Sequence, residues 1–207
     1  MKIFLDIGAH IGETLEAVIG YDYDKIYAFE PCKTSAEYIK CAFTDKRIVV
    51  NNFGLFNDDC EKDIYASGTD GASLYKDKAV WQPHHDINSV EKCKFVKASK
   101  WFLDNIKETD IVIAKFNCEG SEGYIINDLL ESKEWRKVFF AFIDFDVRWF
   151  ESLQHQRKET INRLTKLKYH NWADETLMIL GGIHKDRTEA WINMTEWLIK
   201  NKIKLRP

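Results

Sequence analysis

The fold of this 207-residue chain is decided by one stretch near its start, Ile3-Phe4-Leu5-Asp6-Ile7-Gly8-Ala9-His10-Ile11-Gly12-Glu13-Thr14. Its first half is apolar apart from one acid, which predicts a buried strand over residues 2–7. Its second half carries two glycines, Gly8 and Gly12, which we expect to let a loop approach a ligand that a Cβ would block. A helix is predicted from this loop onward, over residues 12–19.

A second apolar segment predicts another strand over residues 25–29, and this strand is followed by Glu30 and Pro31. A strand, a glycine-containing turn, a helix and a strand with a terminal acid together form a nucleotide-binding half-fold. In such a half-fold the acid accepts hydrogen bonds from the hydroxyls of a ribose, and Glu30 stands at that position. An ordinary α/β turn with two glycines is the alternative, and the spacing to Glu30 argues against it.

The glycine spacing discriminates between nucleotides. A dinucleotide loop reads Gly-x-Gly-x-x-Gly, whereas this loop reads Asp6-x-Gly8-x-His10-x-Gly12 and lacks the middle glycine. Asp6 would repel a pyrophosphate but suits a cation. S-adenosylmethionine (SAM) carries an ammonium, a sulfonium and a carboxylate, and it has no phosphate. We therefore predict SAM rather than NAD as the cofactor.

Four pieces of the chain together resemble the FkbM family of SAM-dependent methyltransferases. They are Phe4–Thr14, Tyr27–Pro31, Asn51–Leu55 and Ala114–Glu122, and they appear in the family's order. The last piece departs from the family's usual Lys-Ile-Asp-x-Glu-Gly-x-Glu, because Asn117 replaces the Asp. The resemblance covers about residues 3–130. It implies a class I SAM-dependent methyltransferase fold and O-methylation, most often of a sugar or polyketide hydroxyl.

The expected cofactor contacts follow the order of these pieces. The methionine end is assigned to Asp6 and to the Gly8–Gly12 backbone, which includes Ala9 and His10, with Asn117 beneath the methionine. Glu30 is assigned to the ribose, and Asn52, Gly54 and Asn57 are placed near adenine. The neighbouring Glu13, Thr14 and Pro31 complete the predicted binding set.

The rest of the chain alternates between predicted strands and helices. Strands are expected over 47–52, 111–116, 138–145 and 172–180, the last in a closing hairpin. Helices are expected over 34–43, 120–130, 150–167 and 190–203. This alternation predicts an α/β fold with a Rossmann-like, doubly wound and mostly parallel sheet. At 45% hydrophobic composition the chain suffices for one full core, so a single methyltransferase domain is predicted over residues 1–207.

Residues 57–100 interrupt this alternation with a polar segment that includes Ser67–Tyr75 and Trp81–Asp86. Ligands in doubly wound folds bind at the carboxyl ends of the strands, and this segment leaves from one such end. We therefore interpret it as an insertion that supplies contacts to the acceptor. A surface β-excursion without ligand contacts is the alternative.

Methyl transfer to a sugar hydroxyl calls for a general base or a metal, because such a hydroxyl is a poor nucleophile at neutral pH. Glu119 is the first candidate base, since the family motif retains an acid at its position. Its alternative role is to cap the following helix. Asp144, near the end of a predicted strand, and His84, in the insertion, are the other candidates. Solvation in a polar loop is the alternative for His84.

A metal site is a separate hypothesis. Glu119, Asp144 and Asp146 supply carboxylate oxygens of the kind that Mg²⁺ prefers. A bound Mg²⁺ would lower the pKa of the acceptor hydroxyl and orient it. Alternate residues of a strand face opposite sides, so only one of Asp144 and Asp146 is expected to face the site. No metal ligand is assigned on this basis.

The amino-acid composition argues against two classes of binding partner, nucleic acids and membranes. The net charge is −3 and the isoelectric point about 6.1, which argues against nucleic acid because phosphate binding is mainly electrostatic. No apolar run approaches the length of a membrane span. The strand predicted from residue 2 already carries Asp6, so no signal peptide is expected and the protein is predicted to be cytoplasmic.

The cysteines support an intracellular setting. There are five, an odd number, and they are widely spaced with no Cys-x-x-Cys. This pattern argues against both a disulfide framework and a zinc site, and a reducing compartment fits it best. The five residues are Cys32, Cys41, Cys60, Cys93 and Cys118.

The predicted C-terminal helix carries an apolar stripe, formed by Trp191, Met194, Trp197 and Leu198. Core packing is the simplest interpretation of a stripe with helical spacing. A homodimer contact is the alternative.

Three functions remain open. The leading hypothesis is a SAM-dependent O-methyltransferase that acts on a hydroxyl of a sugar, a glycan or a nucleotide-linked sugar. The second is an N- or O-methyltransferase of a small metabolite, since an amine acceptor needs less base catalysis. The third is a non-catalytic SAM-binding scaffold, which the replacement at Asn117 favours.

Overall fold

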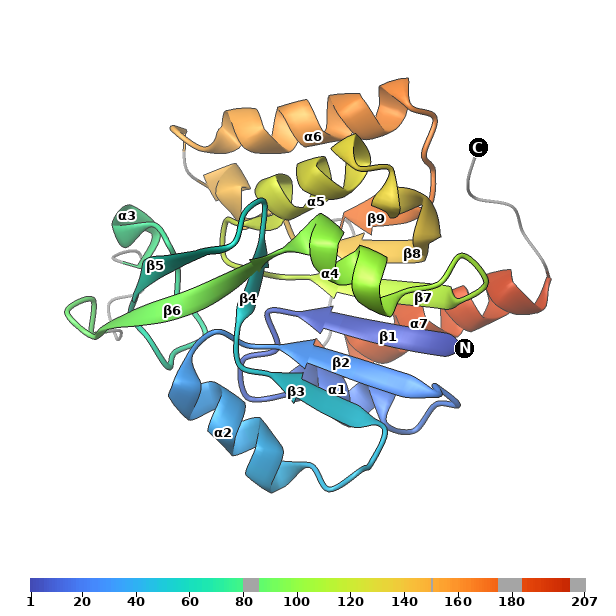
Figure 1. The fold of residues 1–207 in the computed structure, drawn as a ribbon, viewed down its shortest axis with the longest axis horizontal. Helices are drawn as coiled ribbons and strands as arrows, with labels where there is room; N and C mark the ends of the chain where they lie inside the picture. Colours follow the sequence, from blue (N-terminus) through green and yellow to red (C-terminus); the bar gives the residue numbers. More distant parts are fainter. Residues whose placement is uncertain (80–85, 150, 175–183, 202–207) are drawn as a thin grey trace.

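The computed structural model describes residues 1–79, 86–149, 151–174 and 184–201, and its centre is a six-stranded sheet (Figure 1). The strand order is β3-β2-β1-β7-β8-β9, and every pairing in this sheet is parallel. The predicted doubly wound, Rossmann-like sheet is therefore confirmed. Its strands are β1 (Lys2–Ile7), β2 (Lys25–Phe29), β3 (Ile48–Asn51), β7 (Ile111–Phe116), β8 (Val138–Ile143) and β9 (Trp172–Asp174).

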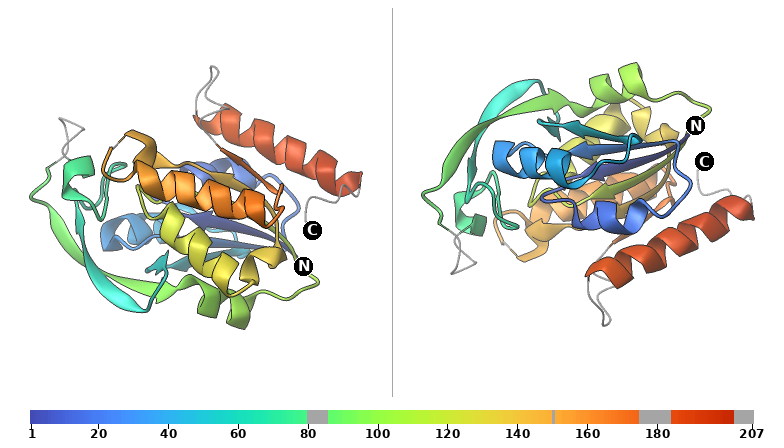
Figure 2. Two further views of the ribbon diagram at one scale, coloured as in Figure 1. Left: turned by 90° about the horizontal axis from the view of Figure 1, so that it is seen from above. Right: turned by 90° about the horizontal axis from the view of Figure 1, so that it is seen from below.

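Helices cover both faces of the sheet, and the strands are accordingly apolar on both sides. In β1, Leu5 packs into the cluster on one face, whereas Phe4 packs into the cluster on the other. The view from above shows α4 and α7 on opposite sides of the strands (Figure 2). The first face is covered by α4 (Ala98–Asn105), α5 (Glu122–Glu131) and α6 (Gln154–Lys166), and the second by α1 (Glu13–Val18), α2 (Lys33–Ala42) and α7 (His184–Lys200).

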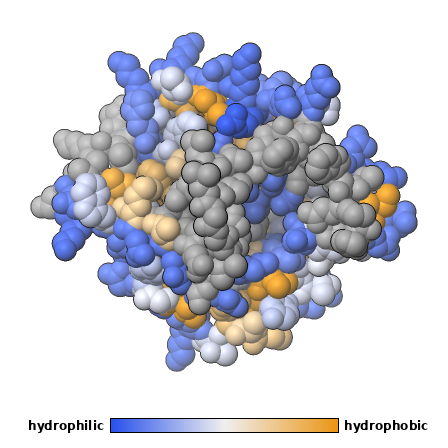
Figure 3. Space-filling view, turned by 180° about the vertical axis from the view of Figure 1, so that it is seen from behind, coloured by the Kyte–Doolittle hydropathy of each residue, from blue (hydrophilic) through white to orange (hydrophobic). Residues whose placement is uncertain are grey.

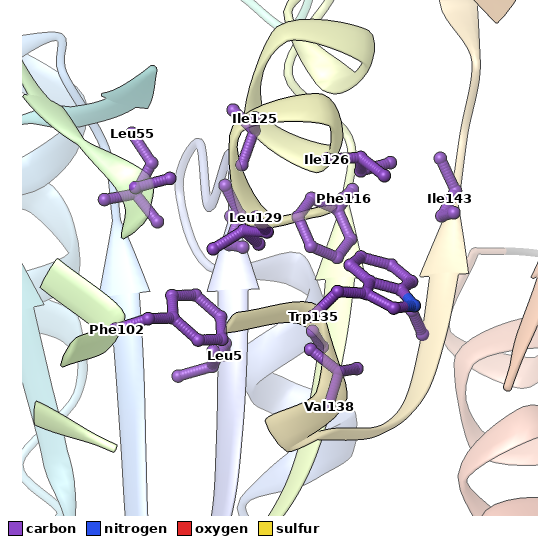
Figure 4. Close-up of a cluster of buried hydrophobic side chains, with 14 of the residues drawn as sticks. Leu5, Leu55, Phe102, Phe116, Ile125, Ile126, Leu129, Trp135, Val138 and Ile143 are labelled. Carbon is purple, nitrogen blue, oxygen red and sulfur yellow. The ribbon is translucent and has the colours of Figure 1, made fainter. Parts of the chain in front are cut away.

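The larger cluster fixes α5 on the sheet. Side chains from β1, β7 and β8 meet one side of α5, and Trp135 fills the space beneath it (Figure 4). Trp135 is fully buried in the short helix η1 (Glu134–Lys137), and its indole N–H donates to Asn171 Oδ1 at 3.3 Å. This packing sets where the loop between β7 and α5 leaves the sheet. The labelled contacts are Leu5, Phe116 and Ile143 from the strands, and Ile125, Ile126 and Leu129 from α5.

A second, three-stranded sheet lies beyond the carboxyl ends of β1 and β2 (Figure 1). It is ordered β4-β6-β5, with β4 (Gly54–Phe56) parallel and β5 (Cys60–Tyr65) antiparallel to β6 (Val90–Lys97). The short helices α3 (Lys76–Ala79) and η2 (Asp146–Trp149) complete the described elements. The described part of the segment at 57–100 contributes β5 and β6 to this second sheet.

Two expectations near the C-terminus change. Strand β9 occupies only part of the predicted 172–180 strand and pairs in parallel with β8, while residues 175–183 lie outside the described ranges. Among the α7 residues whose burial the structure describes, Ile192 and Thr195 are buried, whereas Met194 is 38% and Trp197 58% exposed. The stripe expected in the core was therefore wrong for these two residues, because α7 packs on α1 and β1 through a neighbouring face.

The surface of the described chain is mixed. On the face turned away from the viewer of Figure 1, small apolar patches alternate with hydrophilic side chains (Figure 3). No helix within the described ranges has both the length and the apolar composition that crossing a membrane requires.

Candidate functional site

A cavity of 420 Å³ opens where β1, β2 and β7 end. The register places Ile7 level with Phe29 of β2 and Phe116 of β7, so the next residues of all three strands emerge side by side. The chain order reverses at β1, which is where doubly wound sheets bind ligands. The cavity is lined by Ile7, Gly8, His10, Glu13, Phe29, Glu30, Pro31, Cys32, Gly54, Leu55, Ile64, Thr69, Asp70, Ala72, Leu74, Phe95, Lys115, Asn117, Cys118, Glu119 and Ser121.

Glu30 is held at the base of this cavity by backbone groups. Its Oε2 accepts the N–H of His10 at 2.8 Å, and its Oε1 accepts the N–H of Cys32 at 2.8 Å. Burial raises the pKa of Glu30 well above its usual value, helped by the nearby Cys32 and opposed by the two N–H donors. Each carboxylate oxygen has a further lone pair. Glu30 can therefore accept two more hydrogen bonds from a ligand without losing its orientation.

The two loop glycines are also required by the protein's own packing. Gly8 has a φ of 86°, and a Cβ there would lie 1.8 Å from the carbonyl oxygen of Asn117. Gly12 has a φ of 95°, and a Cβ there would lie 2.5 Å from the ring of Phe43. Gly8 thus lets the loop after β1 touch the loop after β7, while Gly12 lets α1 begin beneath Phe43.

Asp6 lies behind the cavity wall. It is fully buried and 3.4 Å from the ammonium of Lys115, which also contacts the carbonyl oxygen of Gly8 at 3.4 Å. Burial raises the pKa of Asp6, and Lys115 opposes that rise. Sequence reasoning matched Asp6 to a cation of the cofactor. The structure pairs it with a cation of the chain, and Lys115 rather than Asp6 lines the cavity.

His10 and Glu13 form one rim of the cavity. The Nδ1 of His10 lies 2.8 Å from Glu13 Oε1, at the start of α1. Burial alone would raise the pKa of Glu13, but the hydrogen bond with His10 and a backbone N–H hold it at about 2. Glu13 therefore stays ionised near neutral pH. His10 has a φ of 47°, so the loop bends sharply at this residue.

The loop after β7 presents Asn117 and Glu119 to the cavity. Asn117 Oδ1 is buried and accepts no hydrogen bond from the described part of the chain. Glu119 adopts a φ of 52°, which is uncommon for a residue with a Cβ, and its carbonyl oxygen accepts the hydroxyl of Ser73 at 2.7 Å. A strained backbone at a cavity is typical of functional loops.

The N-cap residue of α5 is Ser121, and no side-chain hydrogen bond caps this helix. Glu122 instead holds the loop that precedes the helix. Its Oε1 accepts the backbone N–H of Cys118 at 2.7 Å and that of Gly120 at 3.2 Å. The side chain is fully buried. Burial and the nearby Asp146 raise the pKa of Glu122 to about 8, against the pull of these backbone donors. The carboxyl group thus shapes the loop that carries Glu119.

The opposite wall comes from the second sheet and the turn after it, which sequence reasoning did not resolve into residues. Ile64 and Phe95 form an apolar surface, and Thr69 and Asp70 add polar groups at the cavity. The polar, glycine-containing run at 67–75 was the only signal in the sequence. Pairing of β5 with β6 brings these residues over the main sheet.

Several predicted residues lie away from the cavity walls. Asn52 turns back to donate to the carbonyl oxygens of Glu30 and Pro31 at 3.1 and 3.0 Å, and Asn57 is exposed. Thr14 is buried inside α1. Ala9, Gly12, Asp144 and Asp146 are likewise absent from the lining, and His84 lies outside the described residues.

The predicted carboxylate set for Mg²⁺ does not come together as a group. Among the described residues, Glu119, Asp144 and Asp146 are not a cluster whose ligand atoms all approach within 4.8 Å. The cavity is lined by Glu119 alone of the three.

Comparison with known proteins adds one likeness. No family model matches the chain, and no curated protein matches it. The crystal structure of Methyltransferase FkbM from Methylobacillus flagellatus KT matches 79% of the chain with a TM-score of 0.50 and 18% sequence identity. The match covers 37% of that protein, so the chain aligns with well under half of its length. The likeness shows that the chain has an FkbM-like methyltransferase fold.

Substitution of Gly8 by Ala tests the contact between the two loops. The added Cβ would collide with the Asn117 carbonyl and would demand a left-handed backbone, so we expect a loss of about 2–4 kcal/mol in the free energy of unfolding. The free energy of unfolding is measured by urea denaturation. Gly20→Ala is the matched control, because a Cβ at Gly20 meets nothing within 4 Å. Equal stability of the two variants would contradict the contact.

Substitution of Glu122 by Gln tests its buried carboxyl group. The folded-state pKa of about 8 exceeds the ordinary value of 4.5, so the folded state binds the proton more tightly than the unfolded state. The stability contribution of Glu122 is therefore full below pH 4.5 and is lost as the pH rises to about 8. We expect Glu122→Gln to remove most of this decline. The measurement is urea denaturation between pH 4.5 and pH 8, with Glu16→Gln as the control because Glu16 is exposed. If the free energy of unfolding of both variants falls with pH as it does in the parent, the assignment to Glu122 is wrong.

Proposed function

We propose that this protein is a SAM-dependent O-methyltransferase that methylates a hydroxyl group of a sugar, a glycan or a nucleotide-linked sugar. The observation that carries the proposal is the placement of Glu30. Its carboxylate is fixed by two backbone donors at the end of β2, inside a cavity at the reversal point of the sheet. A buried acid in this position is suited to the two hydroxyls of a ribose.

The residues around the cavity fit the rest of SAM. Leu55 and Phe95 provide an apolar slot of the kind that an adenine ring fills. At the other end, the buried Oδ1 of Asn117 is an acceptor without a partner in the described chain, which suits the ammonium of the methionine moiety. Among the described residues that line the cavity, Lys115 is the only Lys or Arg, and it lies 3.4 Å from Asp6. This lining, poor in cations, supports SAM over a dinucleotide with its pyrophosphate.

When bound, SAM supplies a methyl group that is open to attack by a nucleophile. The chain must hold the acceptor hydroxyl in line and remove its proton. We assign proton removal to Glu119, because its strained backbone and the bond from Ser73 fix it at the cavity. The loop it occupies is in turn shaped by Glu122.

The acceptor is assigned to the side of the cavity formed by the insertion at residues 57–100. Thr69 and Asp70 provide polar groups there, while Ile64 and Leu74 provide apolar contacts. A sugar presents hydroxyl groups around its edge and C–H groups on its ring face. The polar residues of this wall can bind the hydroxyl groups, and the apolar residues can pack on the ring face. We propose that the chain acts as a single cytoplasmic methyltransferase domain and that a small-metabolite acceptor would use the same wall.

Isothermal titration tests the cofactor. We expect SAM and S-adenosylhomocysteine to bind with micromolar affinity and NAD to give no response, with or without Mg²⁺. Glu30→Gln should weaken SAM binding by about tenfold or more, because one ribose acceptor becomes a donor. The exposed Glu37→Gln is the matched control. A chain that binds neither SAM nor its product would overturn the methyltransferase proposal, whereas SAM binding without any methylated product would favour the scaffold.

Substitution of Glu119 by Gln tests the base. For a sugar acceptor, we expect kcat to fall by about 10²–10⁴-fold with unchanged SAM affinity, since general-base catalysis is lost. The readout is the mass gain of one methyl group on screened glycan and nucleotide-sugar acceptors. Asp144→Asn is the control, because Asp144 does not line the cavity. A nearly silent Glu119→Gln would instead favour an amine acceptor, and an equal loss in both variants would move the base assignment away from Glu119.

A further inference from the structure

Beside the cavity, two thiols and a carboxylate converge from distant parts of the sequence. Cys32 directly follows Pro31 and precedes α2, whereas Glu91 and Cys93 are alternate residues of β6. The two sulfur atoms and a carboxylate oxygen all lie within 4.8 Å of one another. Both cysteines are buried and unoxidised, with exposures of 1% and 3%. Among the described residues, Cys32, Glu91 and Cys93 are the group of three His, Cys, Asp or Glu side chains whose possible ligand atoms all lie within 4.8 Å of one another.

The spacing suits a tetrahedral zinc ion. With Zn–S bonds near 2.3 Å and Zn–O bonds near 2.1 Å, ligand atoms of a tetrahedral site are separated by about 3.4–3.8 Å. The observed separations of at most 4.8 Å therefore require each side chain to move by about 1 Å or less, within the reach of small rotations. Two thiolates and one carboxylate supply more negative charge than a divalent cation needs, and thiolates favour zinc over Mg²⁺.

The carboxylate of Glu91 is already oriented. Its Oε1 accepts the backbone N–H of Lys33 at 2.9 Å, and its Oε2 accepts the hydroxyl of Ser67 at 2.6 Å. Such outer contacts are typical of metal ligands, because they fix the ligand's orientation before the ion arrives. They come from two other segments of the chain, so Glu91 is held on both sides.

The surroundings of the two sulfur atoms are consistent with a bound cation. The side chains of Cys32 and Cys93 are hydrogen-bonded to each other. Phe56, Ile64 and Phe95 pack around the pair and exclude water. A low-polarity shell strengthens thiolate coordination.

We propose that Cys32, Glu91 and Cys93 bind one Zn²⁺ ion, which ties the second sheet to the end of β2. The fourth position of the tetrahedron remains for water or for a group at the cavity, since Cys32 lines it. The absence of a Cys-x-x-Cys pair led us to expect no zinc site. The fold brings these residues together, because β6, which carries Glu91 and Cys93, passes over the start of α2, next to Cys32. This proposal does not depend on methyl transfer.

Zinc content of the purified chain tests the proposal. The protein is reduced, stripped with chelator, loaded with Zn²⁺, passed through gel filtration and analysed by mass spectrometry for metal. We expect one zinc per chain, and an affinity lower by about tenfold or more in Cys32→Ser, Cys93→Ser and Glu91→Gln. Cys41→Ser is the matched control, because Cys41 is exposed and lies outside the cluster.

A second measurement needs no substitution. Zinc should slow maleimide modification of Cys32 and Cys93, mapped by peptide mass, and leave the exposed Cys41 unchanged. The proposal is overturned if the reduced chain retains no zinc, if zinc content is unaltered in Cys32→Ser with Cys93→Ser, or if zinc protects neither thiol. Formation of a Cys32–Cys93 disulfide by a chain that retains no zinc when reduced would identify a redox pair in its place.

Discussion

The close approach of two loops is the constraint on which the rest of this structure depends. The loop after β1 runs so near the first residue after β7 that only a residue without Cβ fits at Gly8. The contact follows from the register, because Ile7 and Phe116 end their strands at the same level. It brings the cofactor loop against the loop that carries Glu119. Two halves of the proposed site are thereby fixed by one backbone contact.

Around this contact the chain buries several charged groups and satisfies most of them with its own backbone. Glu30 and Glu122 each accept two backbone N–H groups, and Asp6 pairs with Lys115. Groups held in this way do not have to reorganise when a ligand arrives. One oxygen each of Asp6, Glu122 and Asn117 is buried without a hydrogen-bond partner in the described chain, and of these three residues only Asn117 lines the cavity. A ligand that donates to Asn117 Oδ1 would therefore satisfy an acceptor that the described chain leaves unpaired.

The second sheet turns an open sheet edge into an enclosed site. Without β5 and β6, the ends of β1, β2 and β7 would face solvent, as the reversal point of an open sheet does. The aromatic and aliphatic residues of these strands supply the apolar wall, and the turn after β5 supplies the polar one. The same arrangement places Cys93 beside Cys32. One excursion of the chain thus supplies both the proposed acceptor wall and the proposed zinc site.

The sequence by itself determined the sheet, its winding and the acid at the end of β2, because apolar runs, two glycines and one carboxylate carry that information locally. The neighbours of those residues were decided only by the tertiary structure. Asp6 is buried against Lys115, Glu122 rather than Glu119 accepts the backbone N–H groups of the loop after β7, and Trp197 faces solvent although it lies on an apolar stripe. Each of these outcomes depends on which elements cross over one another. The same is true of Cys32 and Cys93, since sequence spacing reveals a metal site only when its ligands are neighbours along the chain.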